Sequence, residues 1–179
     1  ASSWSNNTGI MGAQCLQPGC PSLKESTVAN VNVVQFTVNN GVPLYTAFAA
    51  ANTNRWTHVV GTYNVGTATT MIYRDGVYVG SSNSVLPLGR APNTLMIGTY
   101  PTGNCFNGSI ANVQIYNMTL NPAQVGRIYY SGIQGAPLQN AGLVAWYPLD
   151  GDANDYGSFI NTGYTSNVAY IQNSYLPKG

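Results

Sequence analysis

The chain has 179 residues, enough for one domain with its own core, and its hydrophobic content of 44% argues against wholesale disorder. Charged residues make up only 6% of it, against roughly 25% in an average soluble domain. The formal net charge of +1 and the absence of an apolar run long enough to span a bilayer exclude a basic nucleic-acid-binding surface and membrane insertion.

Three features of the sequence together favour a secreted protein. Residues 1–4 (ASSW) do not resemble a signal peptide, and we expect a mature end from which a leader has been removed. Disulfide formation in an oxidising compartment is expected, with the pairing left open among Cys15, Cys20 and Cys105. The N-glycosylation candidates are Asn6, Asn107 and Asn117. Together these features favour an extracellular or cell-surface location.

Strand patterns then follow one another along the chain. Alternating segments rich in β-branched residues predict strands at residues 31–38, 43–49, 56–63, 69–74, 77–80, 94–98 and 108–116. Gly, Asn or Pro separate them, and Asp75-Gly76 predicts a tight hairpin turn. This spacing is typical of a sandwich or barrel and not of alternating strand–helix units. We therefore predict an all-β fold.

One short helix is predicted after these strands. Asn121 suits the N-cap, Pro122 suits the first helical position, and Gly132 can end the helix. Residues 135–140 (GAPLQN) have the composition of a linker. The most apolar strand pattern of the chain comes after this linker, at residues 142–149, and a weak strand is predicted at residues 168–171.

Several segments resemble a known family. Residues 54–64 (NRWTHVVGTYN), 71–80 (MIYRDGVYVG), 95–100 (LMIGTY) and 106–132 (FNGSIANVQIYNMTLNPAQVGRIYYSG) are similar to the laminin-G-like branch of the concanavalin A-like lectin/glucanase superfamily. The resemblance covers nearly half of the chain. It implies an antiparallel jelly-roll sandwich with one short helix.

The order of the segments differs from the family pattern. Residues 141–163 resemble the opening strand of the family but follow its closing helix, while residues 4–12 resemble an early-middle strand. We therefore predict a sandwich lacking its first strand at 1–134, a linker at 135–140, and a C-terminal strand segment at 141–179. An unpaired apolar strand would be an aggregation hazard. Three explanations stay open: a circularly permuted chain whose strand completes its own sandwich, a piece of a tandem array, or insertion of the strand into a neighbouring subunit.

The displaced strand predicts a structural function. We expect a pilus-like extracellular filament of identical copies, assembled head to tail by strand donation. The residues expected to be donated are Gly142, Leu143, Val144, Ala145, Trp146, Tyr147, Pro148 and Leu149. The alternative is a secreted carbohydrate- or protein-binding module, monomeric or tandem, with surface glycans as partners. Candidate sugar-stacking residues on loops and rims are Tyr100, Tyr129, Tyr130 and Tyr164, although packing is the favoured interpretation for each of them.

An acidic turn follows the displaced strand. Its oxygen-bearing side chains suit calcium, and the candidate ligands are Asp150, Asp152, Asn154 and Asp155. The favoured interpretation is a solvated turn in which Asp and Asn side chains cap the local backbone. No other cofactor is expected.

The sequence predicts no enzymatic activity. The single histidine, His58, has no identifiable nucleophile partner and is expected on one strand face with Trp56. Outside the acidic turn, the other acidic residues are Glu25, expected in a loop, and Asp75, expected in a hairpin turn. A glycoside hydrolase needs two carboxylates facing each other across its substrate. This pair is not identifiable in the chain.

Overall fold

A computed structural model describes residues 8–14, 21–28, 31–38, 45–49, 55–83, 94–99, 104–133, 135–138 and 140–171. The chain divides into two compact units, residues 1–108 and 109–179. The division falls before the expected linker at 135–140, because β9 (Val113–Tyr116) and β10 (Leu143–Tyr147) pair with each other. No helix in the described part of the chain is long and apolar enough to cross a membrane.

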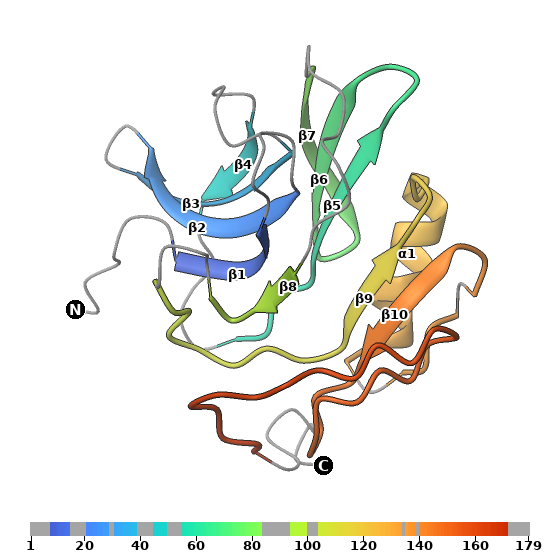
Figure 1. Cartoon of the computed structure of the whole chain (residues 1–179). Helices are drawn as coiled ribbons and strands as arrows, with labels where there is room; N and C mark the ends of the chain where they lie inside the picture. Colours follow the sequence, from blue (N-terminus) through green and yellow to red (C-terminus); the bar gives the residue numbers. More distant parts are fainter. Residues whose placement is uncertain are drawn as a thin grey trace. The chain divides into compact units, whose positions relative to one another are not determined.

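A five-stranded sheet forms one layer of the N-terminal unit, with the order β4-β3-β2-β1-β8 (Figure 1). Its strands are β1 (Thr8–Gln14), β2 (Ser22–Val28), β3 (Val31–Thr37), β4 (Tyr45–Ala49) and β8 (Thr94–Ile97). Each neighbouring pair runs antiparallel. The register places side chains two residues apart on the same face, so that β3 presents alternate residues to opposite faces.

A three-stranded sheet forms the second layer of this unit. Its strands, in the order β5-β6-β7, are β5 (Val59–Asn64), β6 (Thr69–Arg74) and β7 (Val77–Asn83). The turn between β6 and β7 is the predicted one, with φ of 50° at Asp75 and 78° at Gly76. Positive φ at both central positions matches the twist of a two-residue hairpin.

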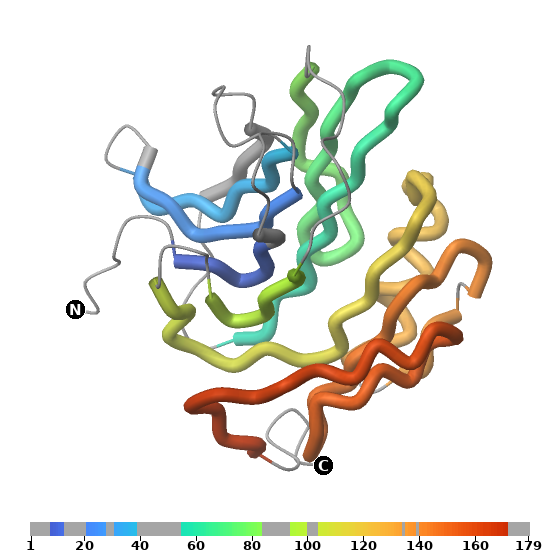
Figure 2. The backbone as a smooth tube through the Cα atoms, in the orientation of Figure 1, coloured from blue at the N-terminus to red at the C-terminus, as the bar shows by residue number. Residues whose placement is uncertain are grey.

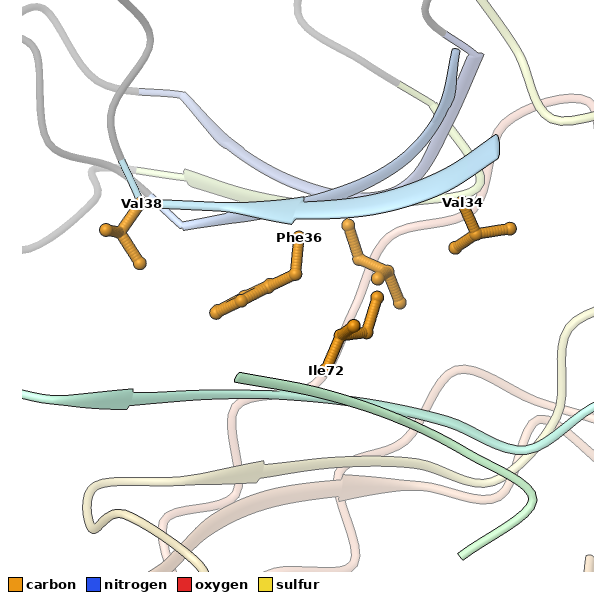
Figure 3. Packing of buried hydrophobic residues seen from close by; sticks show 5 residues of the cluster. Val34, Phe36, Val38 and Ile72 are labelled. Carbon is orange, nitrogen blue, oxygen red and sulfur yellow. The ribbon is translucent and has the colours of Figure 1, made fainter. Parts of the chain in front are cut away.

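The hydrophobic core of the N-terminal unit lies between these two sheets. Figure 3 shows Val34, Phe36 and Val38 pointing from one sheet towards Ile72 of β6. Phe36 is 5% exposed and Ile72 is fully buried. A Cβ atom at Gly61 of β5 would lie 2.3 Å from the Phe36 ring, so glycine is required for this close approach. The prediction of an all-β antiparallel sandwich with one short helix is confirmed.

Strand β2 is the element that the sequence patterns miss, and the expectation that Glu25 lies in a loop is wrong. Glu25 lies within β2, opposite Val34 of β3. The Thr8 hydroxyl donates to its carboxylate at 3.1 Å. Burial raises the pKa of Glu25, and the Thr8 hydrogen bond partly offsets this rise. Backbone pairing on both sides of β2 outweighs the low strand propensity of its Lys, Glu and Ser residues.

The C-terminal unit combines a two-stranded antiparallel sheet with helix α1 (Pro122–Ser131). The helix has the predicted limits. The Asn121 side chain accepts from the Gln124 backbone N–H at 2.9 Å, and the Gln124 side chain accepts from the Asn121 N–H at 2.8 Å. This capping box satisfies two donors at the helix start. Val125 and Ile128 are its buried apolar positions.

Three strand predictions need correction. The strand expected at 56–63 begins at Val59, and the one expected at 108–116 begins at Val113. Trp56 and His58 therefore precede the strand, where the His58 backbone N–H and C=O both bond to Asp75 of the hairpin turn. Residues 168–171 form no strand, because this exposed segment pairs with no strand in the described part of the chain.

Candidate functional site

A cavity of about 290 Å³ lies within the C-terminal unit. It forms where β10, the segment after α1 and the loop after β10 meet. The described residues that line it are Asn112, Ile133, Gly135, Trp146, Pro148, Asp150 and Tyr156. Two of these side chains are large aromatic rings, and one carries a carboxylate. The cavity is therefore the candidate binding site.

Trp146 and Tyr156 form the aromatic part of the cavity wall. Trp146 lies on β10, and its indole Nε1–H donates to Asn112 Oδ1 at 2.8 Å. Tyr156 meets it edge to face, with ring centroids 6.0 Å apart and an interplanar angle of 60°. Such a geometry is favoured between aromatic rings. The indole orientation is thus fixed by a hydrogen bond as well as by packing.

Asn112 holds three segments around the cavity together. Its Oδ1 atom also accepts from Gln114 Nε2 at 3.1 Å, and its Nδ2 group donates to the carbonyl oxygens of Gly132 at 3.2 Å and Gly135 at 3.5 Å. The backbone φ of Asn112 is 52°, a left-handed conformation that Asn tolerates better than most residues. Asn112 therefore connects β9, β10 and the end of α1.

A hydrogen-bond chain extends from Asn112 along the same face of β9. The Tyr116 hydroxyl donates to Gln114 Oε1 at 2.7 Å, and Gln114 in turn donates to Asn112. Burial raises the pKa of Tyr116 to about 12, so its hydroxyl stays protonated and keeps donating at neutral pH. This chain fixes the amide orientation of Gln114 and, through it, that of Asn112.

Asp155 ties the loop after β10 to that strand. Its carboxylate, 5% exposed, accepts from the backbone N–H groups of Trp146 at 2.8 Å, Gly157 at 2.7 Å and Asn161 at 2.8 Å. Tyr156 N–H donates back to the Trp146 carbonyl at 2.8 Å. Figure 2 shows the chain after β10 returning beside that strand. These bonds occupy the edge of β10 that β9 leaves open at Trp146, and they bring Tyr156 to the indole.

The pKa of Asp155 reflects two opposing causes. Burial pushes this pKa upward, but the backbone hydrogen bonds from Trp146, Asn161 and Gly157 together outweigh burial and hold it below its ordinary value. The side chain is therefore ionised at neutral pH, and the charge strengthens each hydrogen bond that it accepts. Asp155 has a structural part in forming the cavity.

The geometry of the acidic turn agrees with backbone capping better than with calcium binding. Asp152 accepts from Asn154 N–H at 2.9 Å and from the Tyr156 hydroxyl at 3.1 Å, and the Asn154 backbone bond is the main cause of its lowered pKa. Both Asp155 oxygens already accept N–H groups. Within the described residues, no three Asp, Glu, His or Cys side chains are placed to hold a metal ion. Calcium binding by Asp150, Asp152, Asn154 and Asp155 stays a prediction that this geometry does not favour.

The strand expected to be donated pairs within its own chain. β10 runs antiparallel to β9, with Leu143 opposite Tyr116, Trp146 opposite Gln114 and Tyr147 opposite Val113. This pairing is described within one chain, and exchange of the strand between copies stays a prediction. Ala145 and Tyr147 are buried there, so the apolar strand is covered on part of its surface.

The other predicted site residues that the structure describes are not among the residues that line the cavity. Tyr129 and Tyr130 pack against each other on α1 with centroids 5.4 Å apart, and Tyr164 is fully exposed. Asp75 forms an ion pair with Arg55 and accepts from His58 N–H, which accounts for it as a hairpin residue. The His58 pKa is lowered by burial, against a smaller opposing effect of Asp75. None of these residues lines the cavity.

The candidate modification sites stay predictions. Asn107 and Asn117 are exposed, as glycosylation requires, and Cys105 is exposed with its thiol 3.8 Å from the Thr99 hydroxyl. The candidates outside the described residues are Asn6, Cys15, Cys20 and Tyr100.

Comparison with known proteins shows the family. The model for Laminin_G_3, described as the concanavalin A-like lectin/glucanases superfamily, matches residues 23–126, more than half of the chain. The chain belongs to this family, which confirms the resemblance predicted from its sequence. No curated protein sequence matches it.

A solved structure supports the fold assignment. It is that of a Bacteroides ovatus protein described as a "putative carbohydrate binding protein", with 20% sequence identity and a TM-score of 0.64. The alignment covers 87% of this chain, which in turn spans 46% of that protein. At this level of identity the likeness concerns the fold.

Proposed function

We propose that this chain is an extracellular carbohydrate-binding module and that the cavity beside Trp146 and Tyr156 is its sugar site. The observation that carries the proposal is an aromatic-walled cavity with a carboxylate among its lining groups. Aromatic faces suit the C–H surface of a sugar ring, and a few polar groups in such a cavity fix the orientation of the ligand. Membership of a lectin-like family and the description of the structural neighbour support this class of ligand.

The fixed orientation of Trp146 supports binding with little rearrangement. Its indole N–H is held by Asn112, and its backbone is held by Asp155. A side chain that is already ordered loses less conformational entropy when a ligand binds. The cavity is thus organised before the sugar arrives.

The proposal is for binding without hydrolysis. Glycoside hydrolysis needs one carboxyl group as an acid and a second as a base or nucleophile. In the acidic loop, Asp152 and Asp155 are engaged in hydrogen bonds that hold the loop together. Asp150 is the carboxylate that lines the cavity.

A glycan array identifies the sugars that bind the protein. Isothermal titration calorimetry with these sugars then tests the proposal. Replacing an aromatic residue at the centre of an interface typically costs about 2 kcal/mol, so Tyr156→Ala is expected to weaken binding roughly thirtyfold. Tyr130→Ala is the matched control, because Tyr130 is 86% exposed on α1 and does not line the cavity. Unchanged affinity in Tyr156→Ala, or an equal loss in both variants, would contradict the proposed site.

Assembly by strand donation remains a second proposal. The observation that favours it is the β9–β10 ladder, which joins residues on either side of the 135–140 segment. The same ladder can form between two copies if β10 is exchanged. A chain lacking residues 139–179 should then bind a peptide of residues 141–171 added in trans, and the intact protein should form polymers by light scattering. A stable monomer at high concentration would contradict this proposal.

A further inference from the structure

The charge and the size of the cavity define a narrower class of ligand. Resting on the proposed glycan-binding function, we infer that the cavity takes one sugar ring, uncharged or carrying an amine, at the end of a glycan chain, and that it rejects acidic sugars. The inference depends on the polar groups still available in the cavity, on its electrostatics and on its volume.

Most polar side-chain groups at the cavity are already engaged. Asn112 uses both its amide oxygen and its amide nitrogen, the Trp146 indole N–H donates to it, and the Tyr156 hydroxyl donates to Asp152. Asp150 differs from these residues, because its exposed carboxylate has no hydrogen-bond partner in the part of the chain that the structure describes. A carboxylate only accepts hydrogen bonds. The ligand must therefore bring donors, which neighbouring sugar hydroxyls or an ammonium group can supply.

The electrostatics of the cavity point the same way. Neither Lys, Arg nor His is among the described residues that line it. Asp152 and Asp155, both with lowered pKa values, add negative charge in the same loop as Asp150. Arg127 is the cationic side chain of the described part of this unit, and it lies on α1 outside the lining. A uronic acid or a sulfated sugar would place like charges together, which disfavours binding and provides specificity.

The volume limits how much of a glycan can enter. At about 290 Å³ the cavity lies at the small end of ligand pockets, which span roughly 300–1,000 Å³. A cavity of this size suits a small ligand such as one sugar ring, and not a run of several rings. A ring inside a polymer carries neighbours on two sides, whereas a terminal ring carries one. The terminal ring is therefore the better fit.

Three matched probes test the charge selectivity: the methyl glycosides of glucose, glucosamine and glucuronic acid, with the galactose series measured in parallel. Calorimetry should show binding of the neutral or amino sugar in at least one series, and at least tenfold weaker binding of its uronic acid. Asp150→Asn should bring the affinities for the neutral sugar and the uronic acid to within about threefold of each other and remove any preference for the amine. Tyr130→Lys changes the net charge equally at an exposed position on α1 and should leave the discrimination intact.

Chain-end recognition has its own measurement. Extending the monosaccharide that binds best to its trisaccharide should change the affinity less than about threefold, because a single ring is held. A gain above tenfold, or equal binding of the acidic and neutral sugars, overturns this inference while the proposed glycan-binding function stands. If no glycoside binds, and no glycan on the array binds either, the proposed function itself fails.

Discussion

Different interactions stabilise the interior of each of the two units. In the N-terminal unit, Phe36 and Ile72 fill a core between two sheets, and the Phe36 ring lies so close to Gly61 that a Cβ atom there would clash with it. In the C-terminal unit, apolar residues of α1 and β10 are also buried, but the segments around the cavity are fixed by Asn112 and Asp155 through hydrogen bonds. The first arrangement provides stability, and the second provides the geometry of the proposed sugar site.

The largest expected effect is in the N-terminal core. Phe36→Ala should lower the free energy of unfolding by about 3–5 kcal/mol, because it removes buried ring surface and leaves a cavity. Urea unfolding followed by circular dichroism measures this change. Val77→Ala is the matched control on an exposed strand position and should stay within about 0.5 kcal/mol. A loss below about 1 kcal/mol for Phe36→Ala would show that this core is not what holds the unit together.

A smaller and more local effect is expected at Asn112. Asn112→Ala leaves the part-buried Trp146 indole N–H without its partner, which should cost about 1–3 kcal/mol. Hydrogen exchange should show faster exchange in the C-terminal unit and little change in the N-terminal one.

Asn112→Gly separates the two parts that Asn112 plays. Glycine accepts the positive φ of this position but makes none of the side-chain hydrogen bonds. The glycine variant should therefore remain destabilised. If Asn112→Gly keeps the hydrogen-exchange protection of the unaltered chain, then the backbone conformation of this residue, and not its side-chain hydrogen bonds, stabilises the C-terminal unit.

Acidification should affect the two units in opposite directions. Asp155 has a folded-state pKa below its ordinary value of 3.8, so its stabilisation is present above about pH 4 and is lost as the pH falls through the lowered pKa. Glu25 has a pKa raised above 4.5, so its ionised form destabilises the fold, and this cost disappears as the pH falls through the raised value. In Asp155→Asn, the stability of the C-terminal unit should fall less as the pH is lowered. In Glu25→Gln, the stability of the N-terminal unit should rise less as the pH is lowered. Hydrogen exchange across pH 3–7 measures both, and parallel trends would contradict this assignment.

The smallest effect on stability is expected at Tyr156. Because the ring is 55% exposed and packs edge to face on Trp146, Tyr156→Ala should cost about 1 kcal/mol or less. Its effect on sugar affinity should be much larger than its effect on the unfolding midpoint. If the sugar affinity and the unfolding midpoint of Tyr156→Ala fall in proportion to each other, binding is lost through unfolding.

The sequence predicts elements that depend on local patterns better than it predicts the hydrogen-bonded segments around the cavity. Alternation around Ile72 and the cap at Asn121 are local signals, and the structure has β6 and α1 at the expected residues. Strand β2 is not predictable in this way, because its polar residues carry almost no apolar alternation and its pairing with distant strands is not a local property. Likewise, nothing in an irregular acidic loop indicates that Asp155 bonds to the Trp146 backbone or that Tyr156 reaches the indole. The cavity depends on contacts between segments far apart in the sequence. The tyrosines predicted from loops and rims therefore do not include Tyr156, which lines the cavity.

One measurement tests the central claim most directly. In a ¹⁵N-labelled sample, the indole Nε1–H signal of Trp146 can be assigned through Trp146→Phe and followed while a methyl glycoside that binds is added. We predict that this signal and the amides of Tyr156 and Gly157 shift with saturation, while the amides of β2 and β3 stay in place. Saturable shifts confined to the N-terminal unit, with the Trp146 signal unchanged, would contradict the account.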